Sequence, residues 1–168
     1  EVAALLRHED DLHLDLRTLS FRFVFAPPGP PKPAASLASY AANGSGTVQG
    51  LRDRDKDAQI EFWQRAAKEG FSDERVRASA HKFRAEFAAL ENRLASKPYL
   101  LGDELSVLDI AWFIYAHRLS LAGYPFKRLH PGVEAWYRKL IARPEFAKEV
   151  AGTRKPQSEV AETLEMVA

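Results

Sequence analysis

Residues 76–94 repeat an apolar side chain at alternating intervals of four and three, and this spacing constrains the fold more than any other feature. The repeat consists of Val76, Ala80, Phe83, Phe87, Leu90 and Leu94. Because an α-helix has about 3.6 residues per turn, these side chains share one face of a helix. An apolar face of this length needs neighbouring helices to cover it. The stretch therefore predicts a long core helix.

Helical spacing continues on both sides of this repeat. In residues 2–25, apolar residues recur at intervals of three, four or seven and predict an amphipathic helix, although Phe21, Phe23 and Phe25 also alternate as in an edge strand. A further helix is expected over residues 53–69, ending at Gly70. Ser72 is expected to cap the start of the long helix that carries the repeat at 76–94. The remaining helices cover 107–121, 131–142 and 144–150. With no alternation of strands and helices, the fold class is all-α, a helical bundle.

A Pro/Gly-rich stretch interrupts this pattern after the first helix. Residues 26–33 read APPGPPKP and residues 43–50 read NGSGTVQG. Repeated proline removes backbone donors and glycine adds freedom, so we expect a long, flexible, irregular insertion over 26–52 that does not contribute to the core.

Composition and charge limit the function classes. The 168 residues hold 24 Lys and Arg against 23 Asp and Glu, so no excess positive charge favours nucleic acid. There is no cysteine, which excludes disulfides and a cysteine nucleophile. No apolar run reaches the roughly 20 residues of a membrane span. We expect a cytoplasmic protein with one domain over 1–150 and a polar tail over 151–168.

Ser106 and Asp109 stand at the start of an apolar segment, IAWFIYA. The spacing is that of a capping box, in which the Ser106 hydroxyl and the Asp109 carboxylate each accept a hydrogen bond from the other residue's amide. Leu105 and Ile110 stand at the positions of a hydrophobic staple. The pair predicts a structural cap at the start of a helix that is buried on nearly every side, and no catalytic role.

The segment RHEDDLHLD, residues 7–15, brings His8 and His13 close to four acidic residues. The spacing resembles half of a metal site. A charged run on an amphipathic helix is usually a solvated face, and no second histidine-rich segment offers further ligands. We therefore expect no metal.

Three ordered motifs resemble the C-terminal helical domain of the glutathione transferase superfamily. They are the leucine pair at Leu90 and Leu94, the segment YLLGDELSVLDI at 99–110, and the segment from Pro131 through Trp136 to the pair Arg143 and Pro144. The resemblance covers residues 87–150, and residues 2–25 fit the first helix of that domain more weakly. The insertion at 26–52 departs from the family pattern.

The resemblance implies that two domains of the complete protein have different roles. Members carry a thioredoxin-like domain that binds glutathione and stabilises its thiolate, and no such pattern stands in this chain. We expect that domain upstream of Glu1, so that the chain is a fragment of a glutathione transferase and is inactive alone. The family also implies a homodimer that pairs through the helices at 2–25 and 76–94.

The resemblance assigns to this domain the wall that binds the electrophilic substrate. The expected lining residues are Arg17 and Phe21, one turn apart, with Trp112 and Tyr115 on the central helix; none is catalytic. Core packing is the alternative for the last two, and an ion pair with Asp10 or Asp11 is the alternative for Arg17. At the level of function, the alternatives are a non-catalytic protein-interaction module of the same superfamily and a solitary bundle that has lost its function.

Overall fold

The computed structural model describes residues 1–25, 32–44 and 46–152 and confirms an all-α fold. The expected polar tail, 151–168, lies almost entirely outside these residues. In chain order the elements are α1 Val2–Asp11, α2 His13–Ser20, the π-helical turn η1 Phe21–Phe25, α3 Ala34–Ala42, β1 Thr47–Val48, β2 Leu51–Arg52, α4 Arg54–Glu69, α5 Asp73–Leu94, α6 Val107–Leu121, α7 Phe126–Leu129, α8 Pro131–Ile141 and α9 Pro144–Val150.

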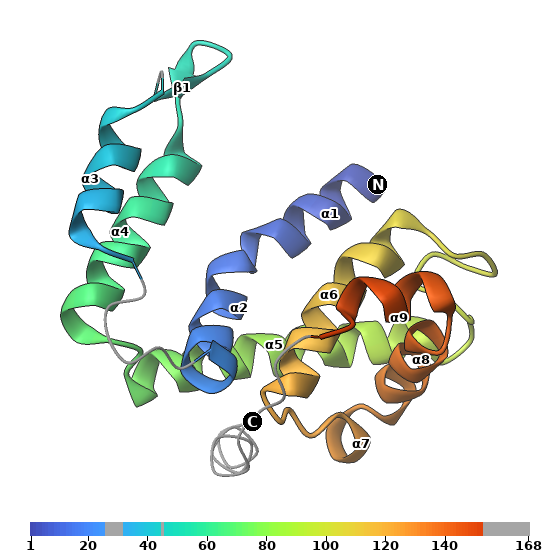
Figure 1. The fold of residues 1–168 in the computed structure, drawn as a ribbon. Coiled ribbons are helices and arrows are strands. Elements are labelled where there is room, and N and C mark those ends of the chain that lie inside the picture. Colours follow the sequence, from blue (N-terminus) through green and yellow to red (C-terminus); the bar gives the residue numbers. More distant parts are fainter. Residues whose placement is uncertain (26–31, 45, 153–168) are drawn as a thin grey trace.

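The first expected helix is divided into α1, α2 and η1, which follow one another along the chain (Figure 1). At Leu12 the backbone amide donates to the carbonyl of Glu9, three residues back, so the helix tightens there. Residues 21–25 remain helical, and the edge-strand alternative is wrong. Four residues of the expected apolar face, Leu12, Leu16, Leu19 and Phe23, are buried in the core.

The expectation that residues 26–52 are irregular throughout and stay out of the core is wrong, because the stretch contains a helix and its Leu37 is buried in an apolar cluster. Residues 34–42 form α3, and β1 pairs antiparallel with β2 across a turn in which Gly50 has a φ of 77°. Pro33 stands at the N-cap of α3, where a missing amide proton costs no helical hydrogen bond, and the helix itself is rich in alanine. Residues 26–31 and 45 lie outside the described part, and flexibility of the segment stays a prediction.

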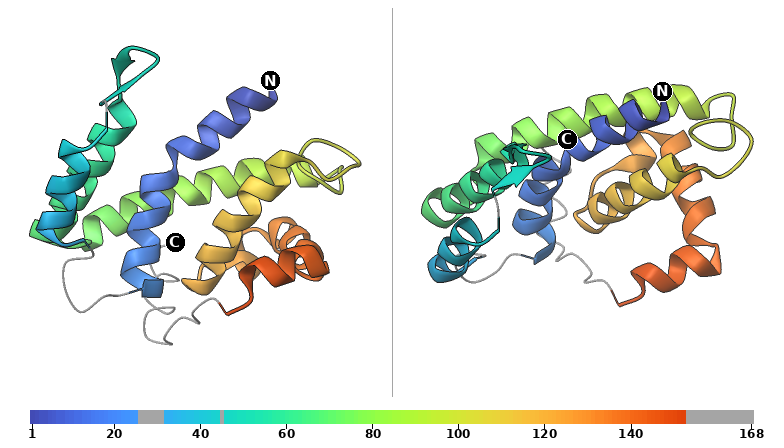
Figure 2. Two further views of the ribbon diagram at one scale, coloured as in Figure 1. Left: turned by 45° about the horizontal axis from the view of Figure 1, so that its top comes forward. Right: turned by 90° about the horizontal axis from the view of Figure 1, so that it is seen from above.

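Helices α3 and α4 lie side by side and stand off from the other helices, with the β1–β2 hairpin at their far end (Figures 1 and 2). The two expected caps are present: Gly70 ends α4, and the Ser72 hydroxyl accepts from the amide of Arg75. In addition, the Asp53 side chain accepts from the amide of Lys56 at the start of α4. We refer to α3 and α4 together as the α3–α4 pair.

Helix α5 carries the predicted stripe into the core. Val76, Ala80, Phe83, Phe87 and Leu90 are buried, and Leu94 packs against them at the end of the stripe. Helices α2 and α8 contact α5, and α6 meets it through aromatic rings, with Phe87 against Trp112 and Phe83 against Tyr115.

Helix α6 is not buried on every side, which corrects the sequence-based expectation. Its residues Val107, Ile110 and Ile114 are 52%, 50% and 38% exposed and share one helical face. Near that face Leu105 and Ile110 line the same cavity of about 250 Å³. The opposite side, with Leu108, Trp112 and Ala116, faces the core.

The first turn of α8 is capped by a residue of α5, which lies about 40 positions earlier in the chain. Pro131 and Pro144 occupy first-turn positions of α8 and α9, as expected. The Glu91 carboxylate accepts from the amides of Gly132 and Val133, each at 2.8 Å. A Cβ on Gly132 would lie 2.9 Å from a Glu91 oxygen, so glycine permits this close approach.

The apolar interior consists of two clusters. The larger one joins α2, α5, α6 and α8. The smaller one consists of Leu37, Phe62, Trp63 and Ala66 from the α3–α4 pair, with Leu14, Phe21 and Phe71 packed against it. Phe71 packs against both clusters and its ring stacks with Phe21. Aromatic contacts therefore help to join the α3–α4 pair to the rest of the bundle.

Candidate functional site

The Ser106 and Asp109 pair forms the predicted capping box. Asp109 is fully buried and accepts four hydrogen bonds, from the amide and hydroxyl of Ser106, the amide of Leu100 and the indole of Trp136. Their lengths are 2.9, 2.5, 2.9 and 2.9 Å in that order. Every oxygen of this buried carboxylate is used by the fold, which leaves it a structural residue.

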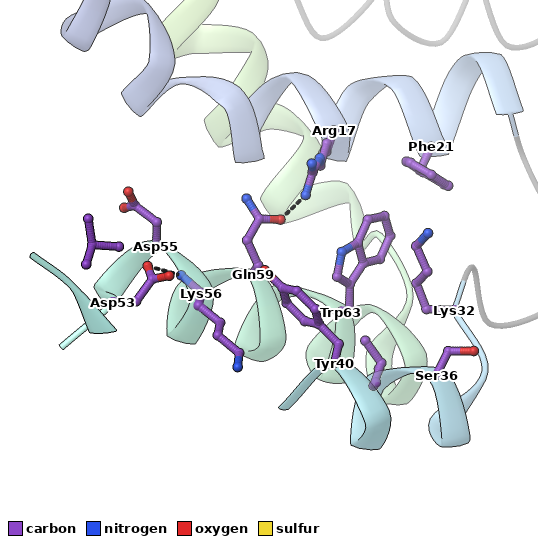
Figure 3. Close-up of a pocket in the computed structure, with 12 residues that line it drawn as sticks. Arg17, Phe21, Lys32, Ser36, Tyr40, Asp53, Asp55, Lys56, Gln59 and Trp63 are labelled. Carbon is purple, nitrogen blue, oxygen red and sulfur yellow. Dashed lines mark hydrogen bonds between the residues drawn. The ribbon is translucent and has the colours of Figure 1, made fainter. Parts of the chain in front are cut away.

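A cavity of about 810 Å³ lies between α2 and the α3–α4 pair (Figure 3). Its described lining comes from α2 and η1 on one side and from residues 32–63 on the other. The lining residues are Arg17, Phe21, Lys32, Ser36, Leu37, Tyr40, Val48, Asp53, Asp55, Lys56, Gln59 and Trp63. The α3–α4 pair therefore builds most of the cavity wall. The cavity volume falls within the roughly 300–1,000 Å³ typical of ligand pockets.

Arg17 and Phe21 are the two sequence-predicted residues that this cavity brings together. Arg17 donates to the side-chain oxygen of Gln59 on α4, not to Asp10 or Asp11. Burial lowers the pKa of Arg17, and the nearby Arg118 lowers it further. Phe21 meets the Trp63 ring edge-on, with the centroids 4.9 Å apart.

Aromatic and cationic groups gather around Trp63. The Arg17 guanidinium lies 5.6 Å and the Lys32 ammonium 5.5 Å from its ring centroid. Tyr40 is 46% exposed and lines the same cavity. A flat, ring-bearing ligand could stack here while its polar groups reach charged side chains.

Trp112 and Tyr115 do not join Arg17 and Phe21 at this cavity, and their expected lining role is not supported. They are 3% and 4% exposed and their rings pack in the core against α5. The Tyr115 hydroxyl donates to the Glu9 carbonyl at 3.1 Å, and burial, followed by Glu9, raises the pKa of Tyr115. Their spacing on an apolar helix reflects packing, the alternative stated above.

The two histidines of α1 and α2, His8 and His13, contact different neighbours. His8 contacts Glu86 at 2.8 Å, and His13 lies beside Tyr115, 3.4 Å from its hydroxyl. Burial and the charges of Arg17 and Arg118 lower the pKa of His13. Among residues 1–25, 32–44 and 46–152, no group of three or more His, Asp or Glu side chains is placed to hold a metal ion.

Sequence reasoning missed the contributions of Lys32, Tyr40, Gln59 and Trp63. All four lie in or beyond the stretch expected to be irregular, and they meet α2 only through the tertiary fold. The helical spacing of Phe62, Trp63 and Ala66 was a usable signal, because an apolar face on α4 required a partner helix. No helix in the described part of the chain is long and apolar enough to cross a membrane.

Comparison with known proteins finds a family match over the central part of the chain. Residues 73–139 match the family described as glutathione S-transferase, C-terminal domain. The chain is 35% identical over 85 residues to a probable glutathione S-transferase, GSTF1, of Oryza sativa subsp. japonica, covering 49% of this chain and 37% of that relative. It also matches the crystal structure of the beta-etherase LigF from Sphingobium sp. strain SYK-6, with 26% identity and a TM-score of 0.45, over 67% of this chain and 52% of the other.

The alignments thus span about a third to a half of the length of these two proteins. The matched family segment runs from the first residue of α5 into α8 and includes the capping box of α6. The part of the chain from α5 into α8 therefore matches the C-terminal helical domain of the glutathione S-transferases.

Proposed function

We propose that the chain is the electrophile-binding domain of a glutathione-dependent transferase, whose glutathione is bound and activated mainly by a part of the protein outside this chain. In that reaction the glutathione thiolate attacks an electrophilic carbon, a sulfur–carbon bond forms, and the leaving group departs with its electron pair. The thiol proton is lost before the attack. The residues of this chain bind and orient the electrophile.

One observation carries the proposal: the cavity at Arg17, Phe21 and Trp63 has the size and lining of a small-molecule site. Aromatic rings supply apolar contact for an electrophile. Gln59, Ser36 and the Tyr40 hydroxyl supply a few polar contacts that could fix its orientation. The match of residues 73–139 to the glutathione S-transferase C-terminal domain supports glutathione as the co-substrate of the complete protein.

Direct binding of a neutral electrophile to the purified chain tests the proposal. Isothermal titration calorimetry with 1-chloro-2,4-dinitrobenzene is expected to show saturable binding. Ser36→Trp, which fills the cavity from the exposed side of α3, is expected to abolish it, and Tyr40→Ala to weaken it. Tyr99→Ala is the matched control, because Tyr99 lies outside the cavity and stacks under Lys139.

Absence of saturable binding to the wild-type chain would remove the electrophile-binding role and favour the non-catalytic interaction module. Binding that survives Ser36→Trp would place the electrophile elsewhere on the chain.

We further propose that the complete protein is a cytoplasmic homodimer. A chain without cysteine needs no oxidising compartment. Helices of this domain offer mixed polar and apolar faces for a two-fold contact, among them the flank of α1 that carries Arg7 and Asp11. Sedimentation equilibrium is expected to give a dimer for the complete protein and a monomer or weak dimer for this chain, and a complete protein that stays monomeric at micromolar concentration would refute the assignment.

A further inference from the structure

One end of the cavity holds positive charge that no carboxylate in the described part of the chain neutralises. Arg17 and Lys32 both lie against the Trp63 ring. Arg17 bonds to the neutral amide of Gln59, and neither cation forms an ion pair with a described Asp or Glu. Other cations nearby do so: Arg22 pairs with Asp73 and Lys82 with Asp15.

This arrangement leaves Arg17 in an unfavourable setting when the cavity is empty. The side chain is half-buried, and Arg118 adds a second positive charge near it. A cation withdrawn from water without a counter-charge raises the free energy of the folded state. A bound anion would neutralise that charge and restore strong hydrogen bonds to the guanidinium.

The opposite end of the cavity has the opposite charge. Asp53 and Asp55 line it, far from Lys32 across the cavity (Figure 3). Lys56 lies between the ends, but its ammonium donates to the carbonyl of Asn43 at 2.6 Å and lies 5.5 Å from the Tyr40 ring centroid. An anionic ligand is therefore drawn toward Arg17 and Lys32 and repelled by the aspartates.

We propose that the cavity selects an aromatic ligand that bears a carboxylate, with the carboxylate at Arg17 and Lys32 and the ring against Trp63 and Tyr40. The inference rests on the proposed electrophile-binding function and adds the charge of the preferred substrate. Guanidinium groups bind carboxylates through paired hydrogen bonds, and the aromatic lining matches a planar ring. The Arg17 guanidinium is already held in place by Gln59, which lowers the entropy lost on binding.

Two probes of nearly equal shape but different charge measure how much the negative charge of the ligand contributes to binding. Calorimetry on the whole chain compares 2-naphthoate with the neutral 2-naphthamide. The wild-type chain is expected to bind the carboxylate about tenfold more tightly, as for one charge-assisted interaction. Arg17→Gln and Lys32→Gln are each expected to remove most of this advantage, and Arg65→Gln, on the same α4 that carries Gln59 but outside the cavity, is the matched control.

The outcomes separate the two proposals. Equal affinity of the wild-type chain for both probes overturns the charge selectivity and leaves the electrophile site intact. A preference that survives in both Arg17→Gln and Lys32→Gln overturns it as well. Failure of the chain to bind either naphthyl probe or 1-chloro-2,4-dinitrobenzene overturns the proposed function itself. Circular dichroism shows whether Arg17→Gln folds. If it does not, the affinities of Lys32→Gln for the two naphthyl probes test the charge selectivity, because Lys32 is exposed.

Discussion

The indole Nε1 of Trp136 on α8 donates a hydrogen bond of 2.9 Å to Oδ1 of Asp109 in the first turn of α6. The same oxygen also accepts from the amide of Leu100 in the preceding loop. One buried carboxylate thus fastens a loop, a helix start and a second helix. The capping box is therefore one part of a larger tertiary junction.

Replacing Asp109 by alanine is expected to destabilise the domain by about 3 kcal/mol or more, because several buried donors lose their acceptor together. The free energy of unfolding from urea titration measures the effect. Asp103→Ala, at an exposed position in the adjoining loop, is the control and is expected to change little. An unchanged urea midpoint for Asp109→Ala would show that water replaces these bonds without loss.

Stability is expected to fall as the pH drops below about 6.5. Burial, followed by the charge of Arg118, lowers the pKa of His117, whose ring lies 2.9 Å from the Tyr137 hydroxyl. Between the folded and unfolded pKa values the unfolded chain binds the proton, so stability rises with pH across this window and is lost as pH falls through it.

Thermal melting at pH 7.5 and 5.5 measures this dependence. His117→Asn is expected to reduce the difference between the two melting temperatures, whereas His81→Asn, at an exposed position, is expected to leave it unchanged. Burial also lowers the pKa of His130, so part of the dependence remains in the His117 variant. An undiminished difference would exclude His117 as its source.

Leu37→Ala is expected to loosen the α3–α4 pair without unfolding the bundle. Leu37 is buried in the small cluster with Phe62 and Trp63, and the core helices lie in the other cluster. Local elements with few buried contacts open independently of the core. Hydrogen exchange is expected to accelerate at α3 amides and stay unchanged at α6 amides, and Leu90→Ala is the converse variant, expected to accelerate exchange at α6 amides. Equal acceleration at α3 and α6 in Leu37→Ala would mean that the two clusters unfold together.

The purified chain alone is expected to conjugate glutathione to 1-chloro-2,4-dinitrobenzene no faster than the uncatalysed reaction. The physical reason is that thiolate activation is proposed to reside outside the chain. The absorbance of the conjugate measures the rate with and without protein. Turnover above the background would overturn the proposed division of labour.

The helices and caps could be predicted from sequence because they depend on local spacing. The stripe on α5, the Ser72 cap and the box at Ser106 each involve residues within a few turns of one another. Helix α3 was missed because prolines and glycines flank it, although its alanine content favours a helix. Prolines and glycines mark the ends of a helix, and they do not exclude a helix in the segment between them.

The cavity could be predicted only in part. Arg17 and Phe21 were found from family resemblance and helical spacing, but the contact of Arg17 with Gln59 joins residues 42 positions apart. Nothing in the local sequence sets such a distance. Trp112 and Tyr115 show the converse problem, because a core position and a lining position on an apolar helix have the same spacing.

Trp63 belongs both to the small apolar cluster and to the lining of the cavity. Ligand occupancy and the local opening of the α3–α4 pair are therefore thermodynamically linked, since a ligand that needs the closed arrangement makes opening less frequent. By mass action, a ligand present at about 100 times its dissociation constant would raise the free energy of that opening by about 2.7 kcal/mol. The resistance of α3 and α4 to protease would then rise and fall with the ligand concentration, so these helices would report how much substrate is present.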